Sequence, residues 1–210
     1  MEKEKKIKKT EVIKNIFVLE FDNQVDLAST FIRFQEHYES PEFKGRFFSL
    51  DEYKEWYTKM KGDFTYYTDW GGFNIPSYVL VPFYEGKFNP LTVSENQILE
   101  LFKENEGSFY IIGLYSKNEN LKLSLDHEIA HGLFYTEPEY KEKVLEILNK
   151  YDLEVLKTWL RSKGGYHEVV LLDECHAYGL TGSKKLTVEI DSEMKMELKQ
   201  LFEEWKKKQR

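Results

Sequence analysis

The sequence predicts an α+β protein in which a small mixed β-sheet packs with helices. Two segments rich in aromatic and β-branched residues, 12–21 and 109–116, have the composition of strands. Capping motifs and apolar residues at helical spacing recur along the rest of the chain, and they dominate its second half. The 210 residues are 41% hydrophobic and 16% aromatic, which is enough to form a core.

The N-terminal half contains most of the expected sheet and three expected helices. Residues 1–10 are rich in lysine and indicate a solvated tail before the strand over 12–21. Apolar residues at helical spacing predict a helix over residues 25–38. Capping boxes that begin at Ser49 and Thr92 predict two more helices, which end near residues 60 and 104.

The aromatic stretch over residues 64–83 carries a turn at Trp70-Gly71-Gly72-Phe73. We expect it to form a hairpin or loop whose rings pack into the core. The alternative is a cleft wall whose aromatic rings contact a peptide.

The second half is expected to be mainly helical after the strand over 109–116. A helix over residues 121–135 follows a polar loop, and Thr136 is expected to cap the next helix, with Pro138 in its first turn. A further helix is expected over residues 166–178, and a last one after Asp191 or Ser192. We therefore divide the chain into a region over 1–106, expected to form a cleft wall, and a metal-binding helical region over 107–210, packed as one unit.

The helix over 121–135 contains His127-Glu128-Ile129-Ala130-His131. Residues four apart lie on one helix face, so both imidazoles can reach one ion. Glu128 sits about 100° around the helix, where it can reach a bound water without binding the ion. This pattern is typical of zinc metallopeptidases, and the alternative is a helix with one buried and one solvated histidine.

A zinc ion that keeps one open position for water needs a third protein ligand. Glu174 lies 43 positions after His131 on an otherwise apolar helical face, which makes it the best candidate. His176 and Asp173 are weaker candidates, because they point about 200° and 100° away from Glu174 on an ideal helix. The alternative is that Glu174 is a partly buried carboxylate bonded to a neighbouring side chain.

These residues resemble the gluzincin type of zincin, in which His-Glu-x-x-His and a downstream glutamate hold zinc. Glu174 and Ala177 are also similar to the Glu-x-x-Ala of ImmA/IrrE-type zincins, and the resemblance covers about residues 107–182. It implies that the strand over 109–116 is an edge strand that lines the cleft. Two departures are visible: Tyr178 stands where thermolysin-like enzymes have an aspartate, and no Gly-x-x-His follows His131.

The implied chemistry is hydrolysis of a peptide bond by a zinc-activated water. Glu128 would be the general base, and the oxyanion would need a further donor. Tyr178 and His167 are candidate donors because they share the helix face of Glu174, although either could pack in the core or orient a ligand instead. Tyr66 or Tyr67 are alternatives.

The histidine motif and the resemblance imply a peptide or protein substrate, and composition argues against other partners. The net charge of −7, from 30 basic and 37 acidic residues, argues against nucleic acid. No apolar run is long enough for a membrane span, and no secretion signal is visible. The single cysteine, Cys175, fits a reducing, cytoplasmic location and is expected to be a small buried side chain.

Three functions follow as hypotheses from these patterns. The first is a zinc peptidase, with β-strand addition of the substrate to the 109–116 edge as one binding mode. The second is a latent or regulatory zinc-binding protein of the same fold. The third is a helical domain in which the histidine motif is accidental or structural. The oligomeric state is left open.

Overall fold

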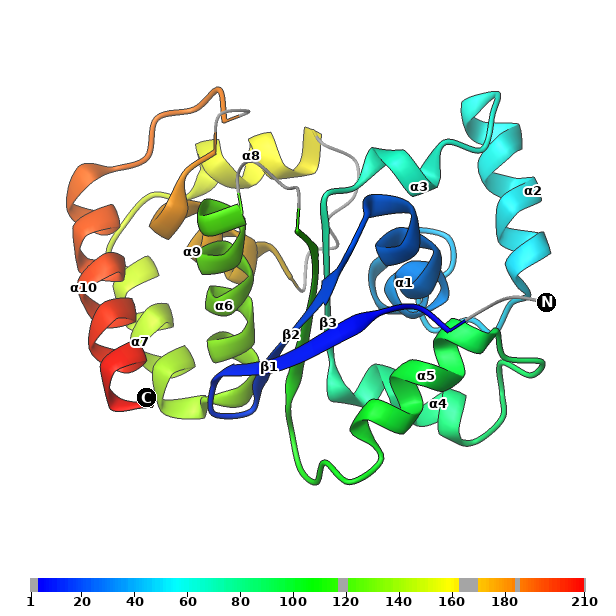
Figure 1. Ribbon diagram of the computed structural model, residues 1–210. Coiled ribbons are helices and arrows are strands. Elements are labelled where there is room, and N and C mark those ends of the chain that lie inside the picture. Colours follow the sequence, from blue (N-terminus) through cyan, green and yellow to red (C-terminus); the bar gives the residue numbers. More distant parts are fainter. Residues whose placement is uncertain (1–3, 117–120, 163–169, 184–185, 210) are drawn as a thin grey trace. The chain divides into compact units, whose positions relative to one another are not determined.

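The computed structural model describes residues 4–116, 121–162, 170–183 and 186–209 of the chain (Figure 1). It confirms an α+β fold with a four-stranded mixed sheet. The chain forms two compact units. Unit 1 comprises Met1–Thr10 and Phe17–Leu121, and unit 2 comprises Glu11–Ile16 and Lys122–Arg210.

The sheet has the strand order β1-β2-β4-β3. The strands are β1 (Ile7–Ile13), β2 (Ile16–Phe21), β3 (Gly72–Pro76) and β4 (Tyr110–Tyr115). Strands β3 and β4 pair antiparallel, with Phe73 opposite Gly113. The expected strand over 109–116 is therefore present as β4, but it is not an edge strand. Because β2 and β3 occupy both of its hydrogen-bonding sides, a peptide cannot add to it.

The N-terminal expectations need two corrections. Asn15, with a positive φ of 62°, turns the chain inside the segment expected to be one strand, so that β1 and β2 form two strands instead. Residues 5–10 are also not a solvated tail. The Lys5 ammonium donates to Ser29 (2.6 Å), and Lys9 donates to the Leu101 carbonyl oxygen (2.6 Å). Both ammonium groups therefore donate hydrogen bonds to residues of helices.

Side-chain caps begin the long helices of unit 1, and two of these caps, Ser49 and Thr92, were predicted from the sequence. Asn23 caps α1 (Gln24–Glu39), Ser49 caps α2 (Leu50–Lys61), and Thr92 forms a complete capping box on α5 (Val93–Phe102). Gly62 ends α2 in the left-handed conformation, with φ 87°. The short elements α3 (Tyr66–Asp69), η1 (Ser77–Leu80) and α4 (Val81–Tyr84) complete the unit.

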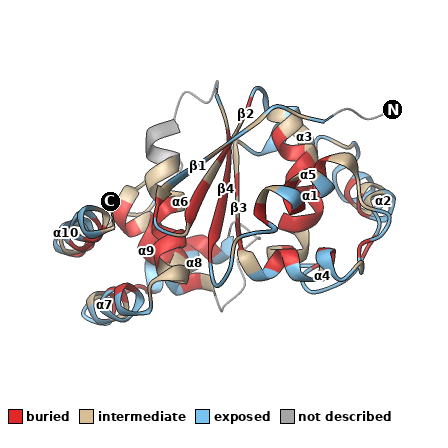
Figure 2. Cartoon of the chain, turned by 60° about the horizontal axis from the view of Figure 1, so that its bottom comes forward, coloured by how far each residue is buried: buried red, intermediate tan, exposed pale blue. Residues whose placement is uncertain are grey.

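Helix α1 packs on strands β3 and β4, and its buried residues lie against them (Figure 2). The ring of Phe31 stacks on that of Phe73, with 5.6 Å between centroids. In the stretch over 64–83, Tyr66 and Phe73 are buried in the core while Trp70 is half exposed. Packing of this stretch into the core is therefore confirmed for these two rings.

Unit 2 contains five helices among the described residues: α6 (Leu121–Thr136), α7 (Pro138–Leu148), α8 (Glu154–Ser162), α9 (Leu171–Thr181) and α10 (Ser192–Lys208). Helix α9 packs against α7, α8 and α10, and α10 also packs against α7. Among the residues that the structure describes, no helix combines the length and hydropathy needed to cross a bilayer.

The caps predicted for the helices of unit 2 can be compared with the structure. Asp191 caps α10 as predicted, by accepting from the amides of Glu193 and Met194. Thr136, however, is the last residue of α6, and its hydroxyl donates to the Gly132 carbonyl oxygen (2.9 Å). Glu137 takes the N-cap position of α7, and Pro138 opens the first turn as expected.

Candidate metal centre

His127 and His131 lie one turn apart on α6, and their Nε2 atoms are 3.3 Å from each other. Two nitrogens that bind one zinc ion at about 2.0–2.1 Å with a tetrahedral angle are separated by about 3.3 Å. The pair can therefore share one cation, or one proton. His131 is buried, with 5% of its surface exposed, whereas His127 is only partly buried.

Helix α9 brings Glu174 to the same point. Its Oε1 lies 3.8 Å from Nε2 of His131, and one ligand atom from each of the three residues lies within 4.8 Å of the other two. The structure therefore brings together the three residues predicted as metal ligands, all within unit 2. Two imidazoles and a carboxylate are a ligand set that zinc accepts in catalytic sites.

The outward nitrogens of both imidazoles also have partners on α9. Nδ1 of His131 lies 2.9 Å from Oδ2 of Asp173, and Nδ1 of His127 lies 3.2 Å from the hydroxyl of Thr181. A carboxylate only accepts hydrogen bonds, and the Thr181 hydroxyl already donates to the carbonyl of Ala177 (2.8 Å). Both Nδ1 atoms are therefore the donors, so that the two Nε2 atoms face each other and could bind a cation in place of a proton.

Asp173 and His176, the weaker candidates for the third ligand, do not belong to the described group that could hold a metal ion, but Asp173 contacts one of its members. Nδ1 of His131 contacts Asp173 directly, while its Nε2 faces Glu174, so both neighbouring residues of α9 meet the same imidazole. His176 is fully buried, and its Nε2 lies 2.9 Å from the hydroxyl of Tyr140. Its Nδ1 faces Oδ1 of Asp173 at 3.8 Å. The angle estimate considered α9 alone and so missed the groups that its neighbours present.

The charges of the site favour a cation. Burial and the neighbouring charge of His131 lower the pKa of His127 to about 3. Burial alone would also lower the pKa of His131, but the charges of Asp173 and Glu174 outweigh it and raise that pKa to about 10. Burial would raise the pKa of Asp173, and His131 lowers it instead, to about 2. Two carboxylates thus face a site that carries one imidazolium charge.

The predicted catalytic residues have different positions. Glu128 lies on α6, is partly buried, and its charge contributes to the raised pKa of His131. The ring of Tyr178 lies edge-on to that of His127, with 4.8 Å between centroids. Tyr66, a candidate donor in unit 1, donates its hydroxyl to Glu36 instead (2.7 Å). His167 falls outside the described residues.

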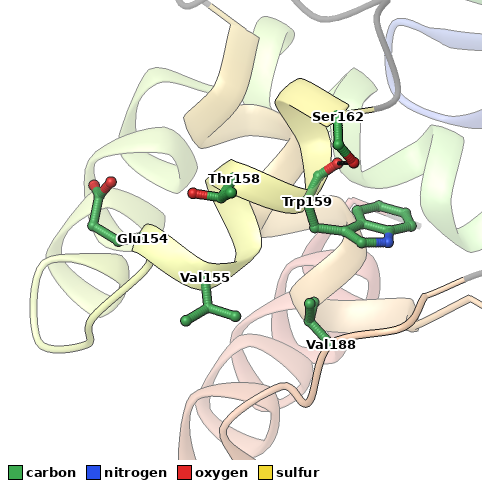
Figure 3. A pocket seen from close by; sticks show the side chains of 6 residues that line it. All are labelled: Glu154, Val155, Thr158, Trp159, Ser162 and Val188. Carbon is green, nitrogen blue, oxygen red and sulfur yellow. Dashed lines mark hydrogen bonds between the residues drawn. The ribbon is translucent and has the colours of Figure 1, made fainter.

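A pocket of about 430 Å³ lies along α8 in the same unit (Figure 3). Trp159 lines it, together with Val155 and Val188, and polar side chains of α8 form the rest of its wall. The Trp159 ring contacts that of Tyr178, with 5.4 Å between centroids. Two aromatic rings thus separate this pocket from His127.

Reasoning from the sequence missed Thr181 and Trp159, and it did not foresee the contact between Asp173 and His131. Thr181 follows Glu174 by seven residues, a spacing that returns to the same helix face after two turns. The spacing of seven residues could therefore have identified Thr181 from the sequence. The contact of Trp159 with Tyr178 depends on how α8 packs against α9, which no local sequence pattern predicts. Comparison of the chain with protein-family models, with curated proteins and with solved structures gave no match.

Proposed function

We propose that this chain is a zinc-dependent metallopeptidase that hydrolyses a peptide or protein substrate in a reducing, cytoplasmic compartment. The observation that carries the proposal is the convergence of His127, His131 and Glu174 within 4.8 Å beside Glu128. A site that served only to hold a structural ion would have no need of the Glu128 carboxylate. Buried, unpaired Cys175 agrees with the compartment.

The two Nε2 atoms have the spacing of zinc ligands, and Glu174 adds a carboxylate oxygen within 4.8 Å of both imidazoles, so His127, His131 and Glu174 would hold a zinc ion. When bound, the ion would supply Lewis acidity, which acidifies water and polarises a carbonyl. Glu128 would take the proton from the attacking water and deliver it to the departing amine. The Tyr178 side chain, packed on His127, is our candidate to donate to the oxyanion.

The first experiment measures zinc by elemental analysis in protein purified without chelator. We expect one zinc per chain in the wild type and in Glu128→Gln, and loss of zinc in His127→Ala and Glu174→Ala. His37→Ala is the control, because its ring lies in unit 1 and bonds to the Arg46 carbonyl oxygen. A wild type that takes up no zinc, even after reconstitution, would overturn the proposal.

The second experiment tests turnover with a peptide library. Wild-type protein loaded with zinc should cleave a subset of peptides, and zinc-loaded Glu128→Gln should not. Equal cleavage by both proteins would refute the role of Glu128. A zinc-loaded wild type that cleaves nothing would replace the peptidase by the latent or regulatory zinc-binding protein.

A further inference from the structure

We propose that Asp173 and Thr181 are positioning residues that fix both imidazoles in the Nδ1–H form, so that both Nε2 atoms face one ion. Neither residue is a ligand in this proposal. It rests on the proposed metal centre, which it deepens by assigning the orientation of the histidines to α9.

The contact between His131 and Asp173 carries the first half of the proposal. Nδ1 and Oδ2 are 2.9 Å apart, and the imidazole has only 5% of its side-chain surface exposed. In such a setting the carboxylate would hold the ring at a fixed rotation about χ2. A ring turned by 180° would place a carbon where Nε2 now lies, and the Asp173 carboxylate would lose its donor.

The contact between His127 and Thr181 carries the second half. The Thr181 hydroxyl donates back to Ala177 in its own helix, and this bond directs a lone pair at Nδ1 of His127. A hydroxyl held in this way can act only as an acceptor toward the imidazole. The neutral ring therefore keeps its proton on Nδ1.

Asp173 also faces a second buried ring, at 3.8 Å, which is beyond hydrogen-bond distance. Its second oxygen faces the His176 ring, and that ring is fixed by the hydroxyl of Tyr140 on the other side. The series Tyr140, His176, Asp173 and His131 joins α7, α9 and α6. Helix α9 thus supplies one ligand and both orienting groups within eleven residues.

The test compares zinc affinities, measured by competition with a chromogenic chelator. Outer groups that orient metal-binding histidines typically contribute 10- to 100-fold to metal affinity. We expect losses of roughly that size in Asp173→Ala and in Thr181→Val. Asp173→Asn, which still accepts a hydrogen bond without the charge, should lose less, and Thr181→Ser should bind zinc as the wild type does.

Two control variants remove similar interactions elsewhere in unit 2. Thr136→Val removes a hydroxyl that donates to a carbonyl four residues earlier, as Thr181 does. Asp126 precedes His127 in the chain, and its carboxylate accepts a hydrogen bond of 2.7 Å from Lys206. Asp126→Asn removes that charge beside the site. Both should retain wild-type zinc affinity. Wild-type affinity in Asp173→Ala and Thr181→Val would overturn the proposal.

Proton NMR of histidines labelled with ¹⁵N separates this proposal from the metal centre itself. An Nδ1–H that donates to a carboxylate gives a downfield signal protected from exchange. We expect this signal for His131 in the wild type and its loss in Asp173→Ala, with or without added zinc. If the wild type binds no zinc, the proposed function fails while this signal still decides the ring orientation. Its absence from the wild type would overturn the positioning role.

Discussion

The carboxylate of Glu95 accepts a hydrogen bond of 2.6 Å from Nε of Arg33, and the side chains of both residues are almost fully buried. The same carboxylate accepts from the backbone amide of Thr92 (2.7 Å) and so completes the capping box of α5. Arg33 also donates to the carbonyl oxygens of Phe88 and Pro90. One buried ion pair therefore joins α1, the start of α5 and the loop before it.

Glu95→Ala should destabilise the protein by about 3–5 kcal/mol, because it leaves the Arg33 guanidinium buried without a counter-ion. Urea denaturation measures the loss. The control is Glu100→Ala on the same helix, whose exposed pair with Lys103 (2.9 Å) contributes less than about 1 kcal/mol. Equal losses in the two variants would show that Arg33 does not depend on Glu95.

Gly113→Ala should destabilise unit 1 by about 1–3 kcal/mol, through overpacking. A Cβ at this position would lie 2.6 Å from the Phe31 ring and 2.7 Å from the Leu27 side chain. Phe31 cannot move aside easily, because its ring stacks on Phe73 and also meets Phe21 edge-on. Thermal unfolding followed by circular dichroism tests the expectation.

Gly72→Ala is the control for that substitution. Gly72 lies on β3 opposite Leu114, and its added Cβ would meet only Leu114 Cδ2 at 3.3 Å and the Gly113 carbonyl oxygen at 3.6 Å. The flexible end of a leucine can yield, so we expect a smaller loss than in Gly113→Ala. The opposite order would contradict the packing argument.

Glu36→Gln should stabilise the protein at pH 7 and have little effect near pH 4. Burial raises the pKa of Glu36, against the hydrogen bond of 2.7 Å from the Tyr66 hydroxyl. The folded state therefore holds the proton more tightly than the unfolded state. The free energy of unfolding therefore falls as the pH rises from the pKa of Glu36 in the unfolded chain to its higher pKa in the folded protein. Urea denaturation across this pH range measures the difference.

Tyr66→Phe provides the converse test of the Glu36 argument. Removing the hydroxyl removes a hydrogen bond that lowers the pKa of Glu36, so the pH dependence of stability should become steeper than in the wild type. A wild-type slope in Tyr66→Phe would show that burial at Glu36 is not opposed by this contact.

Zinc should raise the thermal unfolding temperature of the wild type but not that of His131→Ala. A ligand that binds only the folded state at a hundred times its Kd stabilises it by about 2.7 kcal/mol. Magnesium is the matched control ion, since it prefers oxygen ligands and should produce no comparable shift. A zinc-induced rise that persists in His131→Ala would indicate binding elsewhere.

The sequence predicted those parts of the fold that depend on neighbouring residues. Ser49, Thr92 and Asp191 mark helix starts because a cap bonds to amides only two or three positions away. The place of β4 inside the sheet depends on pairing with residues far away in the chain, which composition does not encode. For the same reason, Asn15 was not recognised as a turn between two paired strands.

The candidate site also has features that local sequence predicts and features that depend on packing between helices. The spacing of His127 and His131 follows from helix geometry, and the apolar face around Glu174 indicated where α9 would be buried. The contact between His131 and Asp173 depends on how α6 crosses α9, and no sequence pattern records a crossing angle. The structure separates Glu174, which belongs to the group that could hold a metal ion, from the neighbouring Asp173, which contacts Nδ1 of His131.

The candidate ligands come from α6 and α9, with α7 and α8 between them in the chain. A bound ion would act as a reversible cross-link between positions 43 residues apart, and closing a loop of that length removes entropy mainly from the unfolded chain. Chelation would then loosen all the helices enclosed by the loop together. Metal supply in the cell would thereby set the lifetime of unit 2 against proteolysis, independently of any reaction at the centre.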